Sequence, residues 1–298
     1  MQKKILFLLL ISFTTLLAQS AGNSGLSFLK LGFGARNIAM GDAGTALSND
    51  VTALFYNPAG LALNPASEVM LMHNEWVQDV RSEILGARTV VFGLPVAVGF
   101  NVTTVSDIPY IVNPGDPVTT FNANSFYGSF STGYKIMDNL AVGVSVKYLY
   151  EAIYVDEATG YGVDFGVTYI TSIKGLNVSA AVKNIGSMNA LRSESTKLPT
   201  EFRVGPSYSF VPAEKFVVTG GAEYQKYTPT SDSHINIGAE VLYDNIVALR
   251  FGYQSGYIAR NVTAGLGLKW GNLSFDYAFA PLTYGLGSGN IFSLQFKF

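Results

Sequence analysis

From residue 67 onward, apolar and polar side chains alternate at every second position over most of the chain. Residues 260–270 show the pattern clearly: Leu266 and Trp270 share one face, whereas Thr263 and Lys269 share the other. A period of two residues is typical of β-strands whose two faces meet different surroundings. The pattern therefore predicts an all-β fold in which every strand has one apolar and one polar face.

The alternating segments predict about fourteen strands, most of them about 8–11 residues long, which is close to the length that a tilted strand needs to cross a bilayer. Strands of soluble sandwiches are shorter, with a mode of about 5–6 residues. We therefore expect a transmembrane antiparallel β-barrel. The predicted strands are residues 68–76, 84–94, 96–105, 124–134, 140–150, 160–170, 176–183, 201–210, 216–226, 234–243, 246–254, 260–270, 273–280 and 290–298.

Short and long connections alternate between these segments. Membrane barrels of bacterial outer membranes combine tight periplasmic turns with longer extracellular loops, so the alternation favours that class. The short connections are expected at 137–139, 171–175, 211–215, 244–245 and 271–272. The longer ones are expected at 106–123, 151–159, 184–200, 227–233, 255–259 and 281–289.

Charged residues are scarce, at 13 % of the chain, whereas soluble proteins contain about 25 %. Those that fall on predicted strands share the polar face. A cationic side chain facing lipid at the bilayer midplane would cost about 2–4 kcal/mol, so we expect these charges to face the lumen. The predicted lumen-facing charges are Lys147, Asp164, Lys183, Arg203, Glu223, Glu240, Arg250, Lys269, Asp276 and Lys297.

The last segment ends in an aromatic residue, and Phe292, Leu294, Phe296 and Phe298 share one face. This pattern resembles the C-terminal signal by which the barrel-assembly machinery recognises outer-membrane clients. The alternative is an ordinary edge strand, but an exposed apolar edge promotes aggregation in a soluble protein. We expect this strand to close the barrel against the first one, with its apolar face toward membrane lipid.

The first 20 residues have the features of a secretory signal peptide. Lys3 and Lys4 precede an apolar run at 5–17, and small residues follow at 18–21. The alternative is an uncleaved membrane anchor, but the run is short for about 30 Å of hydrocarbon. We therefore divide the chain into a signal peptide (1–20), an N-terminal segment (21–66) and the barrel (67–298).

Residues 21–66 do not alternate, and they are rich in Gly and Ala. Small residues let backbones approach closely, so this segment is predicted to form a short helical or irregular hatch (plug) inside the lumen. A turn is expected at 57–60, because Asn-Pro and Gly mark turns.

The hatch segment also carries a motif. Gly34-Ala35-Arg36, Met40-Gly41, Asp50 and Tyr56-Asn57-Pro58-Ala59-Gly60-Leu61-Ala62 resemble the N-terminal signature of the PorV/PorQ family, within the FadL-like group of outer-membrane barrels. The resemblance implies a fourteen-stranded barrel in the bacterial outer membrane. It implies structural roles in the hatch for Gly34, Arg36, Gly41, Asp50, Asn57, Pro58 and Gly60.

The resemblance leaves more than one function open. A PorV/PorQ-type protein would serve type IX secretion or surface attachment, with secretion-system proteins or cargo C-terminal domains as partners. The alternative is a FadL-like channel for hydrophobic compounds, and the third possibility is a general porin. The charges expected in the lumen favour the PorV/PorQ-type function over a channel for hydrophobic compounds. The hatch disfavours an open porin.

Other classes of function lack their chemistry. The chain has no cysteine, which excludes disulfides, thiolate metal sites and a lipid-modified N-terminal cysteine. The formal net charge is −2 without an arginine-rich patch, so nucleic acid is not an expected partner. The two histidines, His73 and His234, have no accompanying nucleophile pattern. We expect no catalytic residue, no cofactor and no metal site.

Overall fold

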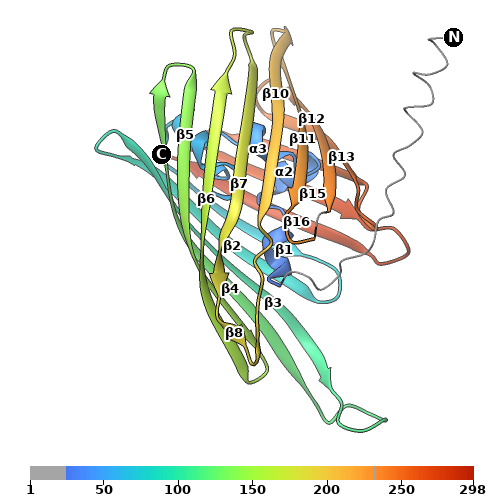
Figure 1. The fold of residues 1–298 in the computed structure, drawn as a ribbon. Helices are drawn as coiled ribbons and strands as arrows, with labels where there is room; N and C mark the ends of the chain where they lie inside the picture. The colour runs from blue at the N-terminus through green and yellow to red at the C-terminus, as the bar shows by residue number, and fades with distance from the viewer. Residues whose placement is uncertain (1–24, 231) are drawn as a thin grey trace, which may run out of the picture.

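The computed structural model describes residues 25–230 and 232–298. Fourteen strands form one closed antiparallel barrel, with β1 (Glu68–Glu75) paired to β16 (Ser288–Lys297) (Figure 1). The predicted fold class is therefore confirmed. The predicted signal peptide lies outside the described residues.

The other barrel strands follow one another around the wall in chain order. They are β2 (Val80–Val91), β3 (Leu94–Tyr110), β4 (Thr119–Met137), β5 (Leu140–Ile153), β6 (Asp156–Ile170), β7 (Leu176–Met188), β10 (Glu201–Ala213), β11 (Phe216–Tyr227), β12 (Ser233–Tyr243), β13 (Val247–Ser255), β14 (Val262–Trp270) and β15 (Leu273–Pro281). A small hairpin of β8 (Ala190–Leu191) and β9 (Glu194–Ser195) lies between β7 and β10.

Several strands are longer than the alternation indicated. β3 has 17 residues and β4 has 19, so only 111–118 remain as their connection. The long loop expected at 151–159 is wrong: Ile153 pairs with Asp156, and the connection is Tyr154-Val155. Tyr154 has a φ of 57°, as tight two-residue hairpins require. Residues 151–153 and 156–159 continue the ladder, because hydrogen bonding between strands does not require the alternation on which the prediction rests.

The connections define two ends of the barrel. We call the end with connections 92–93, 138–139, 171–175, 214–215, 244–246 and 271–272 the turn end, and the opposite end the loop end. The barrel closes at the turn end, where the Phe298 N–H donates to the Ser67 carbonyl at 3.0 Å. The described chain begins at the loop end, where the Gly25 N–H donates to the Lys197 carbonyl at 3.1 Å.

The outer wall is apolar and the inner face is covered. In β12, exposed and buried residues alternate over the whole strand, and the exposed ones include Ile235, Ile237 and Val241. Exposed aromatic residues lie near strand ends, among them Tyr134, Tyr169 and Trp270. On the last strand, Phe292, Leu294, Phe296 and Phe298 are exposed on this outer wall. Such a wall suits contact with acyl chains rather than with water.

Residues 25–66 lie inside the ring of strands, as the blue segment of Figure 1 shows, and we call them the hatch. The hatch contains η1 (Ser27–Lys30), α2 (Ala35–Ala39), α3 (Gly44–Leu47), α4 (Ala53–Tyr56) and η2 (Pro58–Ala62). Within the described residues, no helix is long and apolar enough to cross a membrane.

If the outer wall meets lipid, a cation placed on it will be costly. Leu266 is exposed at the middle of β14, so Leu266→Arg is expected to lower the free energy of unfolding by about 2–4 kcal/mol. Urea titration of the protein folded into lipid vesicles measures this change. Leu286→Arg, in the connection 282–287, is the control and should change little. Equal effects of the two substitutions would contradict a lipid-facing wall.

Candidate functional site

The hatch fills the lumen by touching most of the inner wall. Helix α2 contacts β13 to β16, helix α3 contacts β7, β10 and β11, and η2 contacts β3 to β6. A cavity of about 20 Å³ beside Leu31, Trp76 and Arg260 has room for roughly one water molecule. Larger hollows, of about 470 Å³, lie on the outer wall, lined by exposed residues such as Leu71 and Phe100. The hatch therefore fills most of the described lumen.

Asn57 joins two hatch helices to the wall. Its Oδ1 accepts a hydrogen bond from the Ala59 N–H at 3.1 Å and so caps η2, in which Pro58 is the first residue. Its Nδ2 donates to the Thr45 carbonyl and to Thr168 Oγ1 of β6, both at 3.1 Å. One buried amide thus fixes the turn predicted at 57–60, which forms the beginning of a 3-10 helix.

Two hatch glycines lie where a side chain has no room. Gly41 has a φ of 69°, and a Cβ there would lie 2.6 Å from the Ile237 carbonyl oxygen of the wall. A Cβ on Gly60 would lie 2.3 Å from the Ser48 carbonyl oxygen. Gly34 precedes α2, and its carbonyl accepts from the Ile38 N–H at 3.1 Å. Close backbone contact requires glycine at the first two positions.

Arg36 of α2 connects the hatch to a chain of wall charges. Its guanidinium binds both carboxylate oxygens of Glu240 at 2.8 and 2.9 Å. Arg250 donates to the same Glu240 at 2.6 Å and to Asp276 at 2.7 Å. Two-pronged pairing of this kind fixes orientation as well as charge. The network ties α2 to β12, β13 and β15.

Asp50 holds the hatch segment before α4. Its carboxylate accepts from the Thr52 N–H at 2.8 Å and, at 3.4 Å, from the Gln295 side chain of β16. Burial alone would raise the pKa of Asp50, but the Arg36 guanidinium and the hydrogen bonds from Thr52 outweigh it and lower the pKa below its usual 3.8. Asp50 is therefore ionised at neutral pH and fastens the hatch as an anion.

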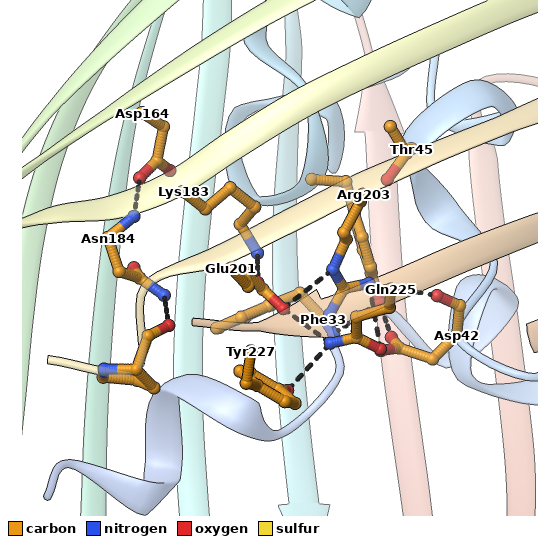
Figure 2. Close-up of polar contacts among 12 residues, drawn as sticks. Phe33, Asp42, Thr45, Asp164, Lys183, Asn184, Glu201, Arg203, Gln225 and Tyr227 are labelled. Atoms are coloured by element: carbon orange, nitrogen blue, oxygen red, sulfur yellow. Dashed lines mark hydrogen bonds and ion pairs between the residues drawn. The ribbon is translucent and has the colours of Figure 1, made fainter. Parts of the chain in front are cut away.

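Arg203 of β10 is the centre of the second network (Figure 2). It lies 3.1 Å from Glu201, 3.0 Å from Glu223 and 3.4 Å from Asp42 of the hatch. Lys183 of β7 pairs with the other oxygen of Glu201 at 2.8 Å. All of these side chains are almost completely buried, so each charge depends on its neighbours for compensation.

The hatch contributes further groups to this second network. The Thr45 N–H donates to Glu223 at 2.8 Å, and the Tyr56 hydroxyl donates to Asp42. Burial, together with the Asp42 carboxylate, raises the pKa of Tyr56 well above its usual 10. Tyr56 therefore remains a neutral hydrogen-bond donor at every physiological pH.

The remaining predicted lumen charges lie in three settings. Lys147 and Asp164 form a buried pair at 2.6 Å across β5 and β6. Lys269 is partly buried on β14. Lys297 is half-exposed, 3.1 Å from buried Glu68. Lys269 and Lys297 thus belong to neither of the two networks, the one around Arg36 or the one around Arg203.

The sequence pattern does not single out four other buried charged residues: Asp42, Glu68, Arg88 and Glu201. Arg88 donates to Glu68 at 2.8 Å and to the hatch carbonyl of Asn49 at 3.1 Å. Glu68 and Glu201 are the first residues of their strands, outside or at the limit of the alternation. Glu68 lies two positions before Met70, and Glu201 lies two positions before Arg203, so each shares the inward face of its strand. This spacing is the sequence signal that could have predicted them.

Toward the loop end, the side of the lumen next to β1 to β5 is largely apolar. Phe28 of the hatch stacks on Tyr127 of β4, with ring centroids 6.2 Å apart. Phe33 meets the same ring edge-on, with centroids 5.9 Å apart. Leu26 and Leu29 belong to the same buried cluster, which also includes wall residues such as Met72, Ile84 and Leu149. The first turn of the hatch therefore occupies an apolar chamber lined by the wall.

Removing the central cation should destabilise the closed barrel. Arg203→Ala leaves Glu201, Glu223 and Asp42 without their shared partner, which we expect to cost about 3–5 kcal/mol of unfolding free energy. Arg192→Ala, at an exposed ion pair of 3.6 Å, is the matched control and should cost about 1 kcal/mol or less. Urea titration followed by tryptophan fluorescence compares them, and equal costs would refute the network's importance.

The lowered pKa of Asp50 predicts how the hatch responds to acid. A depressed pKa means that the stabilisation is present above pH 3.8 and is lost as the pH falls through the lower pKa of the folded state. Conductance in planar bilayers should therefore stay low from pH 7 to pH 5 and rise in stronger acid.

Asp50→Asn should remove about 1.5–3 kcal/mol of hatch stabilisation already at pH 7, and should raise conductance there. Asp116→Asn, in the connection 111–118, serves as the control. Wild-type conductance and an unchanged acid response in Asp50→Asn would contradict the assigned role.

A family model described as "Uncharacterised protein family (UPF0164)" matches residues 18–162, which include the hatch, the first five strands and the first half of β6. No curated protein matches the sequence.

Solved structures share the fold over nearly the whole chain. The Ralstonia pickettii toluene transporter TbuX is 16 % identical over 90 % of this chain and 98 % of its own, with a TM-score of 0.64. The Pseudomonas putida toluene transporter TodX is 13 % identical over 89 % and 98 %, with a TM-score of 0.64. A Pseudomonas aeruginosa FadL homologue is 12 % identical over 89 % and 96 %, with a TM-score of 0.53. The chain therefore has the fold of FadL-like barrels.

Proposed function

We propose that this protein is a channel of the bacterial outer membrane that admits hydrophobic compounds. The outer wall of exposed apolar side chains supports a membrane location. The shared fold of the toluene transporters TbuX and TodX supports transport rather than catalysis.

The observation that carries the proposal is the apolar chamber beside β1 to β5, toward the loop end. Its wall residues, among them Met72, Ile84 and Tyr127, surround Leu26, Phe28 and Leu29 of the hatch. Withdrawal of this first turn would leave an apolar space that opens toward the loops. Hydrophobic molecules bind in such spaces when a few polar groups border them.

The two parts of the hatch are held with different strength. Residues 34–62 include Arg36, Asp42 and Asn57, which bind wall side chains. The segment 25–33 is held by apolar packing, by Lys30 over the Tyr227 ring at 5.0 Å, by the Gly25 N–H on the Lys197 carbonyl at 3.1 Å and by the Phe33 N–H on the Tyr56 hydroxyl at 2.9 Å. The gate in this proposal is therefore the segment 25–33, while the rest of the hatch stays in place.

A reversible lock tests this gate. A Cβ built on Gly25 lies 3.4 Å from the Cβ of Thr196, close to the spacing of about 3.5–4.5 Å in disulfides. The natural chain contains no cysteine, so Gly25→Cys with Thr196→Cys forms a defined pair. Oxidation should reduce toluene uptake at least tenfold in cells that express the protein, and a reductant should restore it.

The two single-cysteine variants are the matched controls and should transport normally in either redox state. Unchanged uptake in the oxidised pair would contradict gating by 25–33. If uptake does not differ from that of cells lacking the protein, the channel function itself is refuted.

A second function is favoured by one observation, the closed and ion-paired lumen. A protein that serves as a membrane-embedded adaptor needs no passage, which agrees with the resemblance of the hatch motif to the PorV/PorQ family. In this case the protein would take part in type IX secretion or surface attachment and bind secretion-system proteins or cargo C-terminal domains. Chemical cross-linking in native membranes, followed by identification of the captured proteins, distinguishes this role from transport.

Biogenesis is proposed to be the same for both functions. The outer face of β16, with Phe292, Leu294, Phe296 and Phe298, would be the part that the barrel-assembly machinery recognises. The exposure of these side chains and their place at the end of the chain support this assignment.

A further inference from the structure

A polar pair interrupts the apolar outer wall next to the seam between the first and last strands. His73 of β1 and Glu83 of β2 face each other across the ladder, with Nδ1 and Oε1 at 2.6 Å. Their cross-strand neighbours in the same row are apolar on both sides: Leu266, Tyr277 and Phe292 on one, Val102 and Phe126 on the other. On β1 and β2, outward-facing polar side chains therefore begin one row nearer the turn end than on the neighbouring strands β16 and β3.

The rows above and below the pair locate it along β1 and β2. Below it, toward the turn end, the row contains Phe275, Leu294, Leu71, Leu85 and Phe100 without a polar side chain. Above it, Glu75 and Arg81 face each other at 3.9 Å. The His73–Glu83 pair thus stands where the apolar belt begins.

A groove runs from this pair into the apolar belt. It has a volume of about 470 Å³ and is lined by Leu71, Leu85, Phe100, Phe275, Phe292 and Leu294, with His73 and Glu83 at its loop end. The His73 and Glu83 side chains are 43 % and 63 % exposed, so both remain accessible beside the groove. The groove is therefore apolar along its length and polar at one end.

We propose that this groove binds one membrane lipid, with an acyl chain along the apolar lining and an ammonium headgroup at Glu83. On this part of the rim, the two carboxylates of Glu75 and Glu83 stand against the single guanidinium of Arg81, and only one Glu83 oxygen, Oε1, contacts His73. A cationic donor complements these carboxylates, whereas an anionic headgroup is repelled. The proposal rests on the membrane location proposed above but not on the channel activity.

The headgroup decides which lipid binds. An acyl chain that enters the groove leaves one apolar environment for another, so its burial supplies packing contacts rather than a hydrophobic driving force. A hydrogen bond between an ammonium and a carboxylate is stronger than one between neutral groups. Phosphatidylethanolamine, which offers N–H donors, should therefore bind better than phosphatidylcholine, which has a cationic headgroup without them.

Native mass spectrometry of the full chain, purified from membranes in detergent, tests the site. The probes are dioleoyl-phosphatidylethanolamine, dioleoyl-phosphatidylcholine and dioleoyl-phosphatidylglycerol, each at equal concentration. We expect one retained phosphatidylethanolamine per chain, bound at least tenfold more tightly than the other two. Glu83→Gln should remove the preference, and Leu71→Trp should fill the groove and abolish retention.

Matched substitutions elsewhere on the outer wall control for general effects. Lys226→Gln changes an exposed charge on β11, and Leu249→Trp enlarges an exposed leucine on β13. Both should retain the lipid, and all variants should migrate as folded barrels on unheated gels.

Three results with the lipids themselves would overturn the proposal, and a fourth concerns the oligomeric state. They are absence of a retained lipid, equal retention of the three lipids, and retention that Leu71→Trp leaves unchanged. A dimer that Leu71→Trp dissociates would assign the groove to a second copy of the chain and would likewise refute lipid binding. None of these measurements depends on uptake. A refuted lipid site would therefore leave the channel proposal standing until the uptake experiment tests it.

Discussion

The structure depends on the pairing of charges in a lumen that excludes water. An outer wall that suits lipid leaves the inner face as the place for charged side chains, and the hatch then separates most of them from solvent. An isolated buried charge costs several kcal/mol, so each one needs a partner on a neighbouring strand or on the hatch. Arg36 and Asp42 supply such partners from within the hatch, so the wall and the hatch stabilise each other.

This dependence divides the lumen into two sides. Charged networks around Arg203 and Arg250 hold the hatch against β7 to β15. Beside β1 to β5, aromatic and aliphatic packing around Tyr127 replaces them. This packing is not directional, so another apolar molecule could take the place of the hatch side chains. The charged side therefore ties the hatch to the wall, whereas the apolar side is where the proposed channel would bind its ligand.

Much of this architecture could be predicted from the sequence. Period-two alternation located the strands because lipid and lumen impose opposite requirements on successive residues. The ends of β3, β4, β5 and β6 were missed because beyond the bilayer that requirement disappears, while the backbone ladder continues. The hatch segment was recognised by its small residues, but its contacts could not be derived, since Asp42 and Asn57 meet wall residues more than 100 positions away.

The outward pair His73–Glu83 was also beyond the sequence pattern. The pair lies on β1 and β2, one row nearer the turn end than the polar side chains of the neighbouring strands. Only the register of β1 against β2 shows that the two side chains meet on the outer face. A histidine near a strand end in isolation indicates nothing about its partner. Cross-strand register, rather than residue type, made this feature visible.

The path of the hatch has a consequence for how the molecule is assembled. Its described chain begins at the loop end, passes through the lumen and reaches β1 at the turn end, where β16 completes the wall. A filled lumen leaves no room to thread five helical turns through a finished cylinder. The hatch should therefore already lie between the strands when β1 pairs with β16. Its charged groups would then help to orient the charged side chains of the strands toward the lumen.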